Sequence, residues 1–244
     1  MKNNFHSIKS LTRDSIAPNG KTFLESTTAH SLQDFEDQDH ECYSSETPLR
    51  ADAFDLSDQE KIEIISLHMK EIMYTLGLDL NDESLKDTPR RVAKMYVQET
   101  FRGLHPANKP RPTLFSNNYN YTQMLVEKDI TLYSTCEHHF VPIIGKAHVA
   151  YFSSGKVIGL SKLNRLVDYY AKRPQVQERL TMQIAEALKE ALQTEDVAVL
   201  VDSAHLCVAS RGIRDIQSST VTAEYSGKFK NSDIRNEFLT HIGK

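Results

Sequence analysis

The order in which helical and strand-like segments follow one another constrains the fold of this 244-residue chain most strongly. Two helical segments come first. One begins at Ser57-Asp58-Gln59-Glu60, a capping-box sequence in which Glu60 occupies the third helical position, and Gly77 can end it. The second is expected to start at Thr88, with Pro89 at the first helical position, and to stop before Gly103.

Strand signals follow these helices. Alternating or β-branched runs predict strands at residues 129–134, 147–152, 156–160, 197–201 and 219–225. Helical periodicity returns twice, once with Ser161 as a candidate cap and once after Pro174. Because these segments come in blocks and do not alternate regularly, we expect an α+β fold. It would have a largely antiparallel sheet with helices on one face.

Residues 1–56 differ in composition from the rest of the chain. They hold 5 Lys and Arg against 10 Asp and Glu, whereas the remainder holds 24 against 23. This polar segment lacks an apolar period, so we expect a disordered acidic N-terminal extension. A regulatory or partner-binding arm is the alternative. The folded domain then covers 57–244, divided into a helical part at 57–127 and a sheet-containing catalytic part at 128–244.

Charge and hydropathy exclude several partners. The net charge is -4 and the folded part is almost neutral, which argues against a nucleic-acid partner. No apolar run approaches the roughly 18 to 20 residues that span a bilayer, so no membrane partner is expected. The N-terminus lacks the apolar core of a secretory signal, which predicts a cytoplasmic location. Three cysteines in such a chain favour thiols or metal ligands over disulfides.

A metal-binding pattern is the strongest local signal. Cys136 and His139 have C-x-x-H spacing directly after a predicted strand, and thiolate and imidazole are ligands that zinc favours. Cys207 is the candidate third ligand. In an extended chain, His205 and Cys207 would point to the same side. Spacing alone is moderately specific, because a free cysteine is usually a small core residue. Cys42, in the extension, is interpreted as an incidental thiol.

The number of protein ligands decides what such a site can do. Three ligands leave a position for water, whereas a fourth from His205 would close the site and make it structural. We expect an open site, because His138 and His205 then remain available for proton transfer.

A second group of residues suggests an anionic substrate. Ser161 and Lys162 lie at a predicted helix start, where backbone N–H groups favour anions. Further cations are Arg91, Arg165 and Arg211, and together they would suit a triphosphate. Each cation by itself is better explained as ordinary surface charge. The carboxylate of Glu178, which follows Gln177, could accept two N–H bonds from a guanine edge.

Six segments in order resemble the GTP cyclohydrolase I family. They are Asp87-Thr-Pro-Arg-Arg-Val-Ala-Lys-Met-Tyr96, Ser134-Thr-Cys-Glu-His-His139, Val157-Ile-Gly-Leu-Ser-Lys162, Arg173-Pro-Gln-Val-Gln-Glu-Arg-Leu180, His205-Leu-Cys207 and Arg211-Gly-Ile-Arg214. Six ordered matches are far more specific than one motif, and the resemblance covers about residues 57 to 242.

The resemblance implies a tunnelling fold (T-fold), in which helices back an antiparallel sheet and a helical part precedes it. It also implies a homo-oligomer, a toroidal decamer with active sites at subunit interfaces. By motif, the residues matching the zinc ligands are Cys136, His139 and Cys207, and those matching the catalytic groups are His138, His205 and Ser161. The residues that match substrate contacts are Arg91, Ser161, Lys162, Arg165, Gln177, Glu178 and Arg211.

The implied reaction is the hydrolytic opening of the guanine imidazole ring of GTP, with Zn²⁺ as cofactor. Water activated by zinc would add to C8 while His205 protonates N7, and a second hydrolysis would release formate. After ribose opening, assisted by His138 and Ser161, ring closure would give dihydroneopterin triphosphate. The segment Val208-Ala209-Ser210 departs from the larger or basic residue found there in relatives, without touching an assigned role.

Two other functions compete with this one. A non-catalytic zinc protein of the same fold would not need His138, His205, Glu178 and Lys162 together. A different pterin or deazapurine enzyme of the tunnelling-fold group could share Glu178, but would not require all three zinc ligands. A nucleic-acid-binding module is a distant third, since the chain lacks an aromatic and basic platform.

Overall fold

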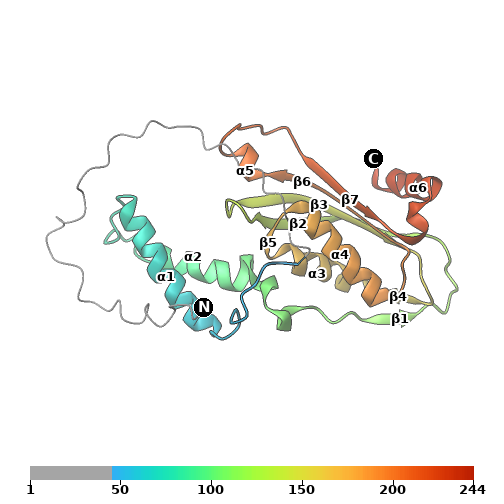
Figure 1. Cartoon of the computed structure of the whole chain (residues 1–244), viewed down its shortest axis with the longest axis horizontal. Helices are drawn as coiled ribbons and strands as arrows, with labels where there is room; N and C mark the ends of the chain where they lie inside the picture. Colours follow the sequence, from blue (N-terminus) through green and yellow to red (C-terminus); the bar gives the residue numbers. More distant parts are fainter. Residues whose placement is uncertain (1–45) are drawn as a thin grey trace. The chain divides into compact units, whose positions relative to one another are not determined.

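A computed structural model describes residues 46–244 of the chain (Figure 1). Cys42 and residues 1–45 of the predicted extension lie outside the described residues. The remaining residues, 46–56, form turns and irregular backbone, and the Phe54 ring lies edge-on to His105 at 5.0 Å between centroids. The boundary at residue 57 stays a prediction.

The first helix begins where its capping sequence indicates. Helix α1 (Asp58–Thr75) has Ser57 as its N-cap, and the Ser57 side chain accepts from the Glu60 backbone N–H while the Glu60 carboxylate accepts from Ser57. Gly77 follows the C-cap with φ +84°, a left-handed conformation that glycine adopts without strain. Both predicted ends of this helix are confirmed.

The second helix is shorter than expected. Helix α2 (Thr88–Met95) has Asp87 as its N-cap, so Pro89 is the second helical residue and not the first. A π-helical turn continues from Tyr96 to Thr100, and two short 3₁₀ turns, Arg102–Leu104 and Pro106–Asn108, follow.

Gly103 lies in the first of these turns, and its backbone N–H donates to the Lys172 carbonyl at 2.9 Å. A Cβ at Gly103 would meet the Tyr169 carbonyl oxygen at 2.0 Å, so only glycine fits this contact.

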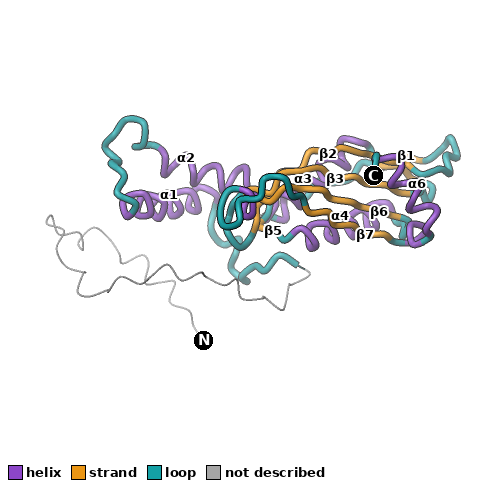
Figure 2. The backbone as a smooth tube through the Cα atoms, turned by 90° about the horizontal axis from the view of Figure 1, so that it is seen from above, coloured by secondary structure: helices purple, strands orange, loops and turns teal. Residues whose placement is uncertain are grey.

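The main sheet has five strands in the order β5-β2-β3-β6-β7. Their bounds are β2 (Leu125–Cys136), β3 (Pro142–Tyr151), β5 (Pro174–Gln175), β6 (Val197–His205) and β7 (Thr220–Tyr225). All pairs are antiparallel except the two-residue β5–β2 pair, and Figure 2 shows the longer strands running side by side. Strands β1 (Leu114–Ser116) and β4 (Lys156–Ile158) pair separately. The antiparallel α+β expectation therefore matches the structure.

Two helices pack against one face of this sheet. Helix α3 (Leu160–Ala171) and helix α4 (Gln177–Leu192) bury their apolar stripes against alternate residues of the central strands. The fully buried residues of this core include Leu132, Val149, Leu163, Leu180, Ile184, Leu188 and Val199. Gly159 is the N-cap of α3, so the prediction that Ser161 caps this helix is wrong. The chain is extended at Gly159 and already helical at Leu160, so Ser161 lies inside the first turn.

The C-terminal helix lies on the opposite face and has no counterpart among the expected elements. Helix α6 (Ser232–Ile242) packs Phe238 against Phe229, and this cluster covers Ala198 and Leu200 of β6. Consecutive strand residues point to opposite faces, so both faces of β6 need cover. The expectation of helices on one face of the sheet therefore holds for α3 and α4 but not for α6. No helix among residues 46–244 is long and apolar enough to span a membrane.

Candidate metal centre

The first half of the site is a tight turn between β2 and β3. Cys136 is the last residue of β2, and its backbone N–H donates to the Val141 carbonyl at 2.8 Å. The Phe140 N–H in turn donates to the Cys136 carbonyl at 2.9 Å, and Phe140 is left-handed with φ +54°. This geometry folds His138 and His139 back beside Cys136, whose Sγ lies 3.8 Å from Nδ1 of His138.

The second half comes from the end of β6. His205 ends this strand, and the short helix α5 (Leu206–Ala209) carries Cys207. Our expectation assumed an extended chain here, with His205 and Cys207 on the same side. That assumption is wrong, because the chain turns helical directly after His205.

Three side chains converge as the spacing predicted. The ligand atoms of Cys136, His139 and Cys207 all lie within 4.8 Å of one another, and His205 is not part of this group. In a tetrahedral site with Zn–S distances of ~2.3 Å, ligand atoms lie roughly 3.8 Å apart. Two sulfurs and one nitrogen within 4.8 Å of one another are therefore close enough to hold one zinc ion, with one position left over.

Burial raises the pKa of Cys207 to about 11, and the adjacent Cys136 thiol adds to the shift. A bound cation would reverse this preference, because it stabilises thiolates.

His205 contacts helix α4 and not the metal group. Its Nε2 lies 2.7 Å from Oε1 of Gln177, the first residue of α4. Burial lowers the pKa of His205, although the nearby Glu178 carboxylate opposes the shift. Gln177 is only 1% exposed, whereas Glu178 is exposed. The expectation that Gln177 helps Glu178 to read guanine stays a prediction, and in the structure the Gln177 amide is bonded inward.

Arg179 is a site residue that the sequence did not single out. Arg179 is only 4% exposed, and its guanidinium pairs with the Glu137 carboxylate and also donates to the Pro174 carbonyl at 3.1 Å. Glu137 lies between Cys136 and His138, so this ion pair ties the metal-binding turn to the first turn of α4. In the sequence, Arg179 is simply an arginine next to Glu178, a pattern that indicates ordinary surface charge and not a buried ion pair.

The cations do not all gather at the metal group. Arg211 Nη1 lies 2.8 Å from Nε2 of His139, which brings one expected substrate contact to the site. Arg91 is exposed on α2, where its guanidinium lies 3.9 Å from Asp87. Among the described residues, no hydrogen bond or ion pair joins Lys162 or Arg165 to the metal ligands.

Helix α3 separates these residues from the metal group of the same chain. Its C-terminal end leads into β5, and Gln175 of β5 pairs with Cys136. Its N-terminal end carries Ser161 and Lys162. A helix of 12 residues is about 18 Å long. One chain therefore holds the two halves of the expected site at opposite ends of α3.

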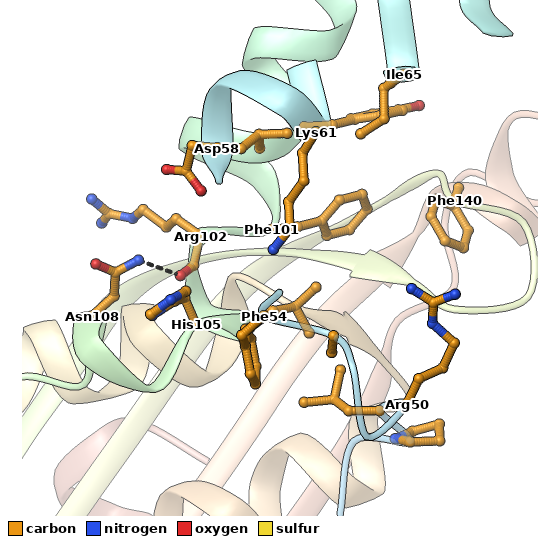
Figure 3. A pocket seen from close by; sticks show the side chains of 16 residues that line it. Arg50, Phe54, Asp58, Lys61, Ile65, Phe101, Arg102, His105, Asn108 and Phe140 are labelled. Atoms are coloured by element: carbon orange, nitrogen blue, oxygen red, sulfur yellow. Dashed lines mark hydrogen bonds between the residues drawn. The ribbon is translucent and has the colours of Figure 1, made fainter. Parts of the chain in front are cut away.

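A cavity of about 510 Å³ lies elsewhere, against the start of α1 and the 3₁₀ turns. Figure 3 shows Lys61, Phe101 and His105 around it, with Phe140 at its margin. Phe140 is the only lining residue next to a candidate ligand, and none of the expected site residues lines this cavity.

Comparison with known proteins gives consistent results. A family model described as GTP cyclohydrolase I matches residues 65–243. The GTP cyclohydrolase 1 of Flavobacterium johnsoniae is 61% identical over 213 residues, which cover 86% of this chain and 96% of that protein. The GTP cyclohydrolase 1 of Enterobacter sp. is 53% identical over 198 residues, 81% of this chain and 89% of that protein.

Among solved structures, an archaeosine synthase QueF-like protein in the apo form is similar to this chain, and the match covers 44% of this chain and 97% of that protein's chain. Its TM-score is 0.38 and its sequence identity 21%.

Proposed function

The chain belongs to the GTP cyclohydrolase I family, and from this premise we propose a role for each group at the candidate metal centre. It is an enzyme that opens the guanine imidazole ring of GTP by hydrolysis, releasing formate and forming dihydroneopterin triphosphate for pterin biosynthesis. The family also confirms the expected tunnelling fold. The cytoplasmic location stays a prediction.

Cys136, His139 and Cys207 would hold the zinc ion. Their convergence within 4.8 Å is the single observation that carries this assignment. Two thiolates and an imidazole are a donor set that zinc prefers, and three protein ligands leave room for water. When bound there, zinc supplies a Lewis acid that makes water a nucleophile near neutral pH.

The two histidines beside this group would move protons. His205 ends β6 two residues before Cys207, and burial lowers its pKa, which makes the protonated ring a stronger proton donor. His138 lies with its Nδ1 3.8 Å from the Cys136 sulfur. Glu178, exposed between two buried neighbours, would accept the N–H groups of the guanine edge.

The triphosphate contacts would come from a neighbouring subunit. Ser161 and Lys162 lie in the first turn of α3, at the end remote from the metal ligands of their own chain, and Arg165 follows one turn later. A second copy would therefore supply them to the same site. Exposed apolar side chains support association, since large exposed apolar patches mark interaction surfaces. The exposed residues of α1 and of the loop after α5 include Leu67 at 65%, Tyr74 at 74%, Ile213 at 82% and Ile216 at 80%. A toroidal decamer is the assembly that the resemblance implies.

The first test is an assay of purified, zinc-loaded protein with GTP, which follows formate release and pterin fluorescence after oxidation. We expect both products in equal amounts and loss of both on chelation. The matched variant His205→Ala should abolish formate release while zinc remains bound. Formate without pterin would contradict the roles of His138 and Ser161. Zinc bound at one ion per chain without either product would point to a structural zinc protein.

A further inference from the structure

We propose that Gln177 is a positioning residue that fixes which ring nitrogen of His205 carries hydrogen, so that Nδ1 is the nitrogen presented to the substrate. The inference rests on the proposed proton-transfer role of His205, and it adds the atom at which the transfer takes place. It also gives the buried Gln177 amide a function other than a direct substrate contact.

The orientation of the Gln177 amide follows from its partners. Its Nε2 lies 3.1 Å from the Val201 carbonyl oxygen and 2.8 Å from the Thr220 carbonyl oxygen. A backbone carbonyl only accepts hydrogen bonds, so the amide nitrogen must face these two atoms. A flipped amide would place its oxygen against both carbonyls. Because the residue is 1% exposed, water cannot relieve that repulsion.

The state of His205 follows in turn. With the amide nitrogen facing the strands, Oε1 of Gln177 is the atom 2.7 Å from Nε2 of His205. An amide oxygen only accepts, so Nε2 must carry hydrogen. Nδ1 is then the only ring nitrogen that can gain or release the mobile proton. Within the described part of the chain, no hydrogen bond engages this second nitrogen, which leaves Nδ1 for the substrate.

The position of Gln177 explains why this control matters. Gln177 begins α4, and the next residue is the exposed Glu178, whose charge acts on His205. The same helical turn therefore places the guanine-reading carboxylate and orients the proton-transfer ring. If the His205 ring is held in one orientation relative to Glu178, it also has one fixed position relative to the guanine that Glu178 binds. Catalysis requires this geometric precision.

Neutron diffraction from crystals of the zinc-loaded enzyme tests the assignment directly, because it locates deuterons. We expect a deuteron on Nε2 of His205, directed at Gln177, whether or not Nδ1 carries a second one. A deuteron on Nδ1 with Nε2 bare would overturn the proposal. This readout does not depend on turnover. It therefore stands even if the enzyme released no formate from GTP, which would instead refute the proposed function.

Kinetics of two variants separate positioning from packing. Gln177→Met keeps the volume but removes the acceptor, and we expect kcat to fall about 100-fold with KM for GTP changed less than about threefold. Thr222→Val is the matched control. It removes another partner of the same amide, 3.1 Å from Nε2, and leaves Oε1 facing His205. Its kcat should stay within about threefold of the parent enzyme. Equal losses in both variants, at equal zinc content, would mean that Gln177 only supports packing.

Discussion

At the scale of single residues, His148 couples stability to pH. The ring is 3% exposed on β3, and its Nδ1 accepts from the Asp129 backbone N–H at 3.2 Å. Burial lowers its pKa, Asp129 and Asp202 oppose this, and Lys146 and Lys244 reinforce it. As pH falls below ~6.5, the unfolded chain binds a proton that the folded chain does not, so the free energy of unfolding decreases.

We therefore expect His148→Gln to lose less stability than the parent between pH 7.5 and 5.5. Glutamine still offers an acceptor to Asp129 but takes no proton in this range. Urea unfolding at the two pH values, with zinc present, measures the difference. An identical pH dependence in both proteins would show that His148 does not contribute.

The metal group allows a second prediction at this scale. Three protein ligands leave one coordination position, so the absorption spectrum of the cobalt-substituted enzyme should change when small anions such as azide are added. In a His205→Ala variant the response should persist, because His205 lies outside the ligand group. A spectrum insensitive to anions in the parent, which becomes sensitive in the variant, would make His205 a fourth ligand.

Single residues also show what the sequence could and could not predict. The spacing of Cys136 and His139, with Cys207 after a strand, predicted the convergence that the structure has. The bonds from Gln177 to His205 and from Arg179 to Glu137 were not predictable. They join positions 28 and 42 residues apart, and nothing in a linear pattern specifies side-chain partners at that distance.

At the scale of elements, the first turn of α4 supports the metal-binding turn through the Arg179–Glu137 pair. Replacing Arg179 by Met leaves the Glu137 carboxylate, 21% exposed, without its arginine partner in the turn that carries Cys136. We expect a loss of up to about 3 kcal/mol in unfolding free energy and weaker zinc retention against a chelator. Denaturant titration and zinc analysis measure both.

A matched pair and a double variant control this experiment. Arg102→Met breaks the exposed Arg102–Asp168 pair and should cost less than about 1 kcal/mol. Adding Glu137→Gln to Arg179→Met removes the unpaired carboxylate charge. The double variant should therefore recover most of the lost unfolding free energy. If the double variant were as unstable as Arg179→Met alone, packing and not charge would explain the effect.

The prediction of helices succeeded where local hydrogen bonds fix the end of a helix, and it failed where packing against distant residues determines the helix. The capping box of Ser57 and Glu60 fixed the start of α1, because the cap is formed within one turn. Helix α6 was missed although Asn231 caps it and Gly243 ends it. Its place in the fold comes from packing against Phe229 and one face of β6, which are distant contacts that a local pattern does not show. Helix α5 was taken as extended chain, because four residues carry no periodicity.

At the scale of the whole molecule, a site shared between subunits predicts complementation. Cys207→Ser removes a metal ligand from one chain, and Lys162→Ala removes a phosphate contact that a neighbouring chain would supply. Each variant alone should be inactive. Random mixed oligomers, formed by co-expression, should recover activity at about a quarter of their sites, because each site needs one intact residue from each type of chain.

The formate assay on co-expressed proteins with two different affinity tags measures this recovery. Tandem purification ensures that both chains are in the same particle. A pair of variants in the same half of the site, Cys207→Ser with Cys136→Ser, is the control and should not complement. Failure of Cys207→Ser with Lys162→Ala, in verified mixed oligomers, would place all contacts in one chain.

The contact at Gly103 has a consequence for how this sequence can diverge. The backbone there approaches the Tyr169 carbonyl so closely that a methyl group would lie 2.0 Å from the oxygen. Arg173 reinforces the joint by donating to the Gly103 carbonyl at 2.8 Å. Neighbouring surface positions can drift over generations, but any exchange at 103 must shift the two backbones apart. We therefore expect relatives that keep this close approach of the two backbones to keep glycine at position 103.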